Sequence, residues 1–225
     1  MTGAWVKSTF AMFVKDLRSE LRTRYALNAL VLFVVVTIAI ILFATSGESI
    51  PRELQSGILW VIVFFSAMSG LSRTFVSEEE RGTVLTLQLV AWPSTVYFGK
   101  LLFNFILIVS VNSLVVVLYL LFMDTFVVRT VSVFLITILL GSVGIAGAAT
   151  IIAAIIAKAN TKGTLYPVLS FPILLPLFMG VITSTQLAVD GEPLAAATGY
   201  FVFLSSYCVV VITASYLLFD FVWKD

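Results

Sequence analysis

The feature that most constrains this chain is a series of long apolar segments with few charged residues between them. Hydrophobic residues make up 60% of the 225 residues and charged residues only 11%, and the mean hydropathy is +1.12. Soluble domains carry about 25% charged residues, so this chain lacks the polar surface that a water-soluble globule needs. We therefore expect an all-α integral membrane protein.

Six segments are long enough to span a membrane, since a helix needs about 20 apolar residues to cross the hydrocarbon core. The chain, residues 1–225, is therefore predicted to form a single transmembrane domain with six spans. These spans are expected at about residues 27–45, 57–75, 101–123, 130–157, 165–189 and 193–222.

The segment before the first span, residues 3–24, has a different pattern. Six apolar residues recur at helical spacing and fall on one face, with basic residues beside them. We expect this amphipathic helix to lie in the membrane interface rather than to cross the bilayer; an ordinary basic flank of the first span is the alternative. The apolar residues are Val6, Phe10, Phe13, Val14, Leu17 and Leu21, and the basic residues are Lys7, Lys15, Arg18 and Arg22.

The distribution of Lys and Arg predicts the orientation of the chain. Of the 13 basic residues, 11 fall in the N-terminal tail, in the loops after the second and fourth spans, and at the C-terminus. The opposite loops hold only Arg52 and Arg129. Cytoplasmic loops carry the excess of basic residues, so we expect both termini in the cytoplasm and an even number of spans.

The insert between the second and third spans, residues 77–92, is expected to be a short transverse helix on the cytoplasmic side. Glu78–Glu80 suit the start of a helix, where the helix dipole favours negative charge, and Pro93 ends the segment. Such an insert predicts a contact with a soluble partner; a solvated turn without a partner is the alternative. The candidate contact residues are Glu78, Glu79, Glu80, Arg81, Gly82, Thr83 and Leu85.

Two patterns within the spans concern packing and bending. Glycine recurs every third residue at Gly141, Gly144 and Gly147, and small residues let neighbouring helices approach closely; lining a substrate path is the alternative role. Three prolines in the fifth span each remove a helix hydrogen bond, so they are hinge candidates or the cause of a fixed bend. These prolines are Pro167, Pro172 and Pro176.

The residue types that are absent exclude several kinds of chemistry. The chain has no His, so imidazole acid–base catalysis and His ligation of a metal or haem are excluded. Cys208 is the single cysteine, which excludes an internal disulfide. A Gly-rich phosphate loop is also absent, so ATP must be bound by another chain. We expect no catalytic residue and no bound metal. The net charge of +1 gives no excess of positive charge that would indicate nucleic-acid binding.

Short motifs spread over residues 1–180 share their order and spacing with one family. They are Gly-Ile-Leu-Trp at 57–60, the run Leu71–Phe75 into Glu79, Glu80, Gly82 and Thr83, then Lys100, Leu140-Gly141-Ser142, Lys162-Gly163, Tyr166-Pro167-Val168-Leu169 and Pro172-Ile173-Leu174-Leu175-Pro176. In these motifs the chain resembles CcmB, a membrane component of the bacterial cytochrome c maturation system that is also called haem exporter protein B. Arg81 and Val84-Leu85 depart from the pattern that is common there.

The resemblance implies an ABC-2-type permease half in the bacterial inner membrane, with an N-terminal interfacial helix and a coupling helix between the second and third spans. It implies two copies of this chain with two copies of a CcmA-like ATPase subunit. It also implies a CcmC-like haem-handling membrane subunit, a CcmD-like small helper and a CcmE-like periplasmic haem chaperone. The implied function is to couple ATP hydrolysis in the partner to haem delivery or to release of the haem-loaded chaperone.

The lack of His favours a mechanical role, in which other subunits carry the haem. Two other classes of function stay open from the sequence. An ABC-2 permease that exports a lipid, a drug or a polysaccharide would use the same insert. A membrane scaffold without an ATPase partner would have the same spans, but its insert would contact no ATPase.

Overall fold

The computed structural model describes residues 2–23, 25–45, 50–158 and 162–224, and these residues form nine α-helices and no strand. Arg24, which ends the predicted interfacial helix, and the chain ends at residues 1 and 225 lie outside the described residues. The helices are α1 (Thr2–Thr23), α2 (Tyr25–Thr45), α3 (Arg52–Leu71), α4 (Arg73–Glu80), α5 (Val84–Val90), α6 (Pro93–Phe122), α7 (Val131–Ala157), α8 (Lys162–Asp190) and α9 (Leu194–Lys224).

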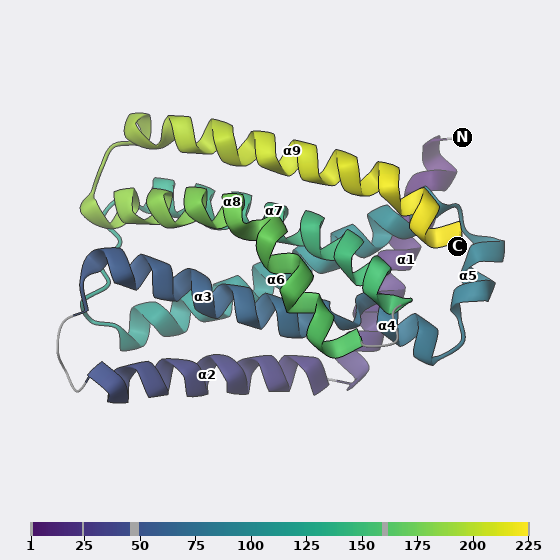
Figure 1. Cartoon of the computed structure of the whole chain (residues 1–225), viewed down its shortest axis with the longest axis horizontal. Helices are drawn as coiled ribbons and strands as arrows, with labels where there is room; N and C mark the ends of the chain where they lie inside the picture. Colours follow the sequence, from purple (N-terminus) through teal and green to yellow (C-terminus); the bar gives the residue numbers. More distant parts are fainter. Residues whose placement is uncertain (1, 24, 46–49, 159–161, 225) are drawn as a thin grey trace.

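The long helices run side by side as a bundle, and α1 lies across one end of it (Figure 1). Over the described residues, five helical segments are long and apolar enough to cross a membrane. In α2 the apolar stretch counted in this way is shorter, Leu30–Thr45. The predicted all-helical membrane architecture is confirmed, and the sixth span stays a prediction. The five segments are Arg52–Glu80, Pro93–Phe122, Val131–Ala157, Leu165–Asp190 and Leu194–Trp223.

The third predicted span begins earlier than the apolar pattern indicated. α6 starts at Pro93 instead of residue 101, with the proline in the first helical turn. Proline suits that position because its fixed φ is helical and its missing N–H has no intrahelical partner there. The first two turns of α6 carry polar residues, including Lys100, which are buried by protein, so hydropathy did not reveal them as helix.

The insert over residues 77–92 contains the last turn of α4 and one separate short helix, α5. The short helix therefore begins after Glu78–Glu80 and not at them, and its role as a coupling helix stays a prediction. α4 follows α3 after a break at Ser72. Glu78–Glu80 form the last turn of α4 instead of the first turn of a helix. The second helix, α5, follows after a tight turn and leads into α6 at Pro93.

The turn between α4 and α5 explains why a single helix cannot form. Gly82 has a φ of 65°, a conformation that glycine adopts without the steric cost other residues meet. Its N–H donates to the carbonyl of Glu79, and the N–H of Thr83 donates to the carbonyl of Glu78, both at 3.0 Å. These two bonds form a Schellman motif, which ends α4.

α7 is the central helix and contacts α3, α4, α6, α8 and α9. Its three glycines lie where a side chain would collide with another helix. A Cβ atom would lie 2.4 Å from Trp60 of α3 at Gly141, 2.7 Å from Leu177 of α8 at Gly144, and 2.9 Å from Ile212 of α9 at Gly147.

α8 continues as one helix through its three prolines. Near the first of them, the Tyr166 hydroxyl donates to the carbonyl of Ala149 in α7 at 3.2 Å. The Ser170 hydroxyl donates to the carbonyl of Tyr166 at 2.6 Å. The first bond ties the start of α8 to α7 and the second lies within α8. A hinge at the prolines stays a prediction.

The two ends of the bundle differ in composition. α1, α4, α5 and both ends of the described chain lie at one end (Figure 1), together with most of the basic residues. At the opposite end, Arg52 lies 3.8 Å from Asp190. The backbone N–H groups of Arg129 and Thr130 both donate to the carbonyl of Ala188 there. The basic and the nearly cation-free loops of the sequence are therefore on opposite ends.

The packing of α7 gives a first prediction. Gly141→Ala should destabilise the protein, because the new methyl group would lie 2.4 Å from the buried ring of Trp60. Overpacking of this kind costs about 1–3 kcal/mol, which a lower thermal unfolding midpoint in detergent would report. Gly57→Ala is the control, since nothing lies within 4 Å of the added atom. Equal midpoints for the two variants would contradict the packing role.

Candidate functional site

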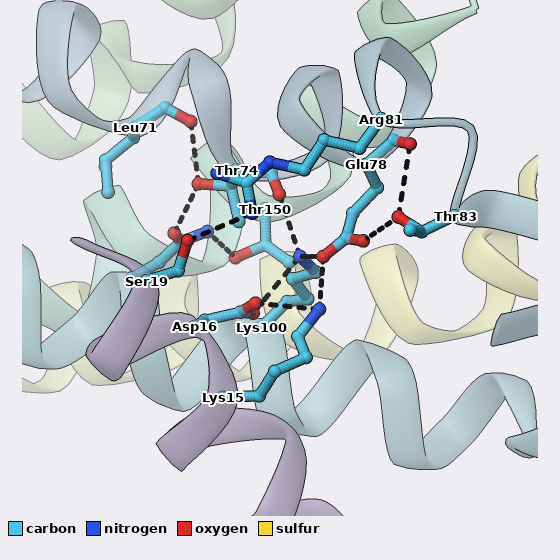
Figure 2. Close-up of polar contacts among 11 residues, drawn as sticks. Lys15, Asp16, Ser19, Leu71, Thr74, Glu78, Arg81, Thr83, Lys100 and Thr150 are labelled. Atoms are coloured by element: carbon cyan, nitrogen blue, oxygen red, sulfur yellow. Dashed lines mark hydrogen bonds and ion pairs between the residues drawn. The ribbon is translucent and has the colours of Figure 1, made fainter. Parts of the chain in front are cut away.

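Four charged side chains meet where α1, α4 and α6 converge, and we call them the ion cluster: Lys15, Asp16, Glu78 and Lys100 (Figure 2). Lys100 is only 1% exposed. Its Nζ lies 3.0 Å from a carboxylate oxygen of Glu78 and 3.1 Å from one of Asp16. It also donates to the carbonyl of Thr74 at 2.8 Å. Lys15 pairs with Asp16 at 3.1 Å and with Glu78.

The balance of charge explains how these groups tolerate burial. An isolated charge in the interior is costly, whereas a paired and hydrogen-bonded one is tolerated. Two cations face two anions here, so the ion cluster is neutral. Burial alone would lower the pKa of Lys15, but Asp16 and Glu78 raise that pKa above its ordinary value. Lys15 therefore stays charged at any physiological pH.

Hydrogen bonds extend the ion cluster to the neighbouring elements. The Thr83 hydroxyl, in the turn before α5, donates to the carboxylate of Glu78. On the other side, the Thr74 hydroxyl donates to the Asn104 side-chain oxygen at 2.8 Å. The Asn104 amide then donates to Thr150 of α7 at 2.9 Å. One network thus joins α1, α4, the turn, α6 and α7.

A cleft of about 460 Å³ lies beside the ion cluster and is lined by residues of α1, α4, α5 and α6. Its lining carries charges of both signs. Arg81, at the end of α4, donates across to the Ser19 hydroxyl of α1 at 3.1 Å (Figure 2). Within the described residues, no group of three His, Cys, Asp or Glu side chains could hold a metal ion.

The predicted contact residues fall into two groups, and the first group faces inward. Glu78 is buried in the ion cluster, and Thr83 is directed toward it. Glu79 is half-buried and borders a small pocket with Phe75 and Trp223. Glu78 therefore holds the insert to the rest of the protein and is not free to contact a partner.

The second group lies on the surface. Glu80 is exposed and lies 3.7 Å from Arg73, and Arg81 and Gly82 are exposed at the turn. Leu85 is exposed on α5, and further apolar residues beyond it are exposed as well. We call this surface the α5 apolar face; it comprises Leu85 (73% exposed), Leu89 (88%), Val90 (80%) and Trp92 (79%).

The ion cluster could not be recognised from the sequence patterns alone. Lys15 belongs to the basic side of the expected interfacial helix, and Lys100 lies at the start of an expected span. Asp16 belongs neither to the amphipathic pattern nor to an apolar run. Two signals nevertheless point to it. Lys100 lies seven residues after Pro93, well inside a helix that starts at the proline. Asp16 lies four residues after Met12, so an acid and an apolar residue share a side of α1 that lies outside the predicted apolar face.

The ion cluster gives a second prediction. Lys100→Met leaves Asp16 and Glu78 buried with Lys15 as the only cation of the cluster beside them. Breaking a buried ion pair costs about 3–5 kcal/mol, so unfolding in detergent should occur at a much lower temperature or denaturant concentration.

Two further variants serve as controls. Adding Glu78→Gln to Lys100→Met removes one charge of each sign and should recover part of the lost stability. Arg73→Met breaks the exposed pair with Glu80 and should cost at most about 1 kcal/mol. If Lys100→Met and Arg73→Met were equally mild, the ion cluster would not be a structural requirement.

Comparison with known proteins supplies the family. No curated protein matches the chain at a significant level. The family model described as "CcmB protein" matches residues 7–219, nearly the whole chain, and confirms the resemblance carried by the sequence motifs. With its apolar helices, the chain belongs to the CcmB family, which makes it a multi-pass membrane protein and an ABC-type permease for haem export in cytochrome c biogenesis, with an ABC ATPase as its partner.

Proposed function

We propose that this chain couples ATP hydrolysis in its ATPase partner to haem delivery or to release of the haem-loaded chaperone, and that the α5 apolar face is where the ATPase binds. The observation that carries the proposal is the exposure of four large apolar side chains on and just after one short helix. A contiguous exposed apolar patch is typical of a protein interaction site. The patch lies at the end of the bundle that holds the basic residues.

The proposal places that end in the cytoplasm of a bacterial cell and the bundle in the inner membrane. The excess of Lys and Arg at this end supports that orientation. α2 would be the sixth span: its 21 residues make a helix of about 31 Å, close to the thickness of the hydrocarbon core. It runs beside α3 and α6 (Figure 1). Both termini would then be cytoplasmic.

Force from the ATPase would reach the spans through the contacts of α5. The Gln88 side chain donates to the carbonyl of Trp223 near the end of α9. The ring of Trp223 stacks on Phe219 and packs edge-on against Phe75 of α4. On the other side, Thr83 binds Glu78 of the ion cluster. A displacement of α5 would therefore move α9, α4, α6 and α1 together.

Other chains would complete the complex. Haem would be carried by these other chains, because this chain has no His to ligate it. A second copy of this chain, a CcmC-like haem-handling subunit, a CcmD-like helper and a CcmE-like periplasmic chaperone would form the assembly. ATP would be bound and hydrolysed by the CcmA-like partner. Family membership favours this function over export of a lipid, drug or polysaccharide.

A third prediction concerns ATPase binding. Leu85→Asp with Leu89→Asp should abolish co-purification of the ATPase, because two carboxylates would be buried in an apolar contact without partners. Folding should be unchanged, since both side chains are exposed. Leu54→Asp is the control, an exposed leucine of α3 at the opposite end of the bundle. Undiminished co-purification of the double variant would overturn the assignment of the α5 apolar face.

A fourth prediction separates binding from coupling. Gln88→Ala removes the bond to Trp223 and leaves the α5 apolar face intact. A hydrogen bond contributes about 1 kcal/mol, so we expect ATP-dependent release of haem-loaded chaperone by the purified complex to fall about fivefold at unchanged ATPase binding. Thr86→Ala, on the exposed side of α5, should release chaperone normally. Transport of free haem without any chaperone would contradict the proposed mechanism.

A further inference from the structure

The side of α1 that faces away from the bundle combines exposed apolar and basic residues. Toward the bundle, Met12 is buried against α6, only 2.7 Å from the position of a Cβ atom on Gly99. On the opposite side, Val6 and Phe10 are each 56% exposed and Leu21 is 53% exposed. We call this side the outer face of α1, and it consists of Val6, Lys7, Phe10, Arg18, Leu21 and Arg22.

The charges of α1 are sorted by side. The two acids of this helix, Asp16 and Glu20, lie on the side that packs toward α6 and α4, where Asp16 joins the ion cluster. Lys7, Arg18 and Arg22 belong to the outer face, since residues three, four and seven apart share a helical side. The outer face therefore carries three cations and no acid among the described residues.

The arrangement within the outer face is also ordered. At 3.6 residues per turn, Val6, Phe10 and Leu21 form one strip along the helix, and the three cations form a second strip beside it. α1 crosses the end of the bundle at a steep angle to the long helices (Figure 1). If α1 lies in the membrane interface, the apolar strip would contact acyl chains and the cations would lie near the lipid phosphates.

We propose that the outer face of α1 is a binding surface for anionic phospholipids, selected over zwitterionic ones. The inference rests on the proposed orientation, which places α1 at the cytoplasmic membrane surface. The apolar strip would contact acyl chains of any lipid, so it gives affinity without selectivity. The cations, with no acid beside them, select negative headgroups, and each basic residue near an anionic surface contributes about a fivefold preference.

The test uses the full-length chain in phosphatidylcholine nanodiscs, in complex with the ATPase. A fluorophore is attached at Ala11→Cys, an exposed position of α1 beside the cation strip, in a chain whose buried native thiol is removed by Cys208→Ser. A small fraction of lipid carries a spin-label quencher, on phosphatidylglycerol in one series and on phosphatidylcholine in the other. Labelled phosphatidylglycerol should quench at least about five times more strongly than labelled phosphatidylcholine.

Variants show which residues are responsible. Lys7→Gln with Arg18→Gln and Arg22→Gln should make the two quenchers equal, and so should high salt, which screens exposed charges. Arg52→Gln with Arg129→Gln, at the opposite end of the bundle, should leave the preference unchanged. Equal quenching in the unaltered chain, or a preference that survives the triple substitution, would overturn the proposal.

A third outcome would point to a different occupant. If neither lipid quenched the fluorophore, and a crosslinker at Ala11→Cys captured the ATPase or a second copy of this chain, the outer face would be a protein interface and the proposal would be wrong. The proposed ATPase coupling is judged separately, because ATPase co-purification is measured on the same nanodiscs. Loss of lipid preference with intact co-purification would leave the coupling function standing.

Discussion

The burial of Lys100 is the constraint on which the end of the bundle that holds α1, α4 and α5 depends. A buried ammonium group needs anions at close range, and Lys100 obtains them from two elements far apart in the sequence, Asp16 of α1 and Glu78 of α4. The position of α1 is therefore fixed by electrostatics as well as by packing against α6. Lys15 completes the arrangement, since without it two carboxylates would share a single cation.

Within the bundle, the structure depends on the close approach of helices, whereas at the end that holds the ion cluster it depends on charge balance. α7 contacts five other helices, and its glycines let Trp60, Leu177 and Ile212 reach its backbone. Hydrophobicity does not drive helices together in lipid, so packing and interhelical hydrogen bonds must do so. The bonds from Asn104 to Thr150 and from Asn112 to Ser142 join α6 to this central helix.

The sequence predicted the helices well and their contacts poorly. Apolar runs and the periodicity of α1 are local patterns. Each reflects whether a helix side faces an apolar or a polar environment, so the observed helices lie close to the predicted ranges. The partners of Lys100 could not be predicted, because pairing depends on tertiary packing between segments that are more than 20 residues apart. The division of the insert was predictable in principle, because a glycine such as Gly82 is the residue that most often follows the end of a helix in a C-terminal cap.

The turn at Gly82 separates the buried part of the insert from its exposed part. If α4 continued through residues 81–83, Glu78 and Leu85 would lie seven residues apart on nearly the same side of one helix, and one of them would be wrongly placed. The Schellman motif redirects the chain, so Glu78 stays buried in the ion cluster while Leu85 becomes exposed. Thr83 bonds back to Glu78 across the turn. A partner that moves α5 must therefore pull on the same carboxylate that holds α1 and α6 in place.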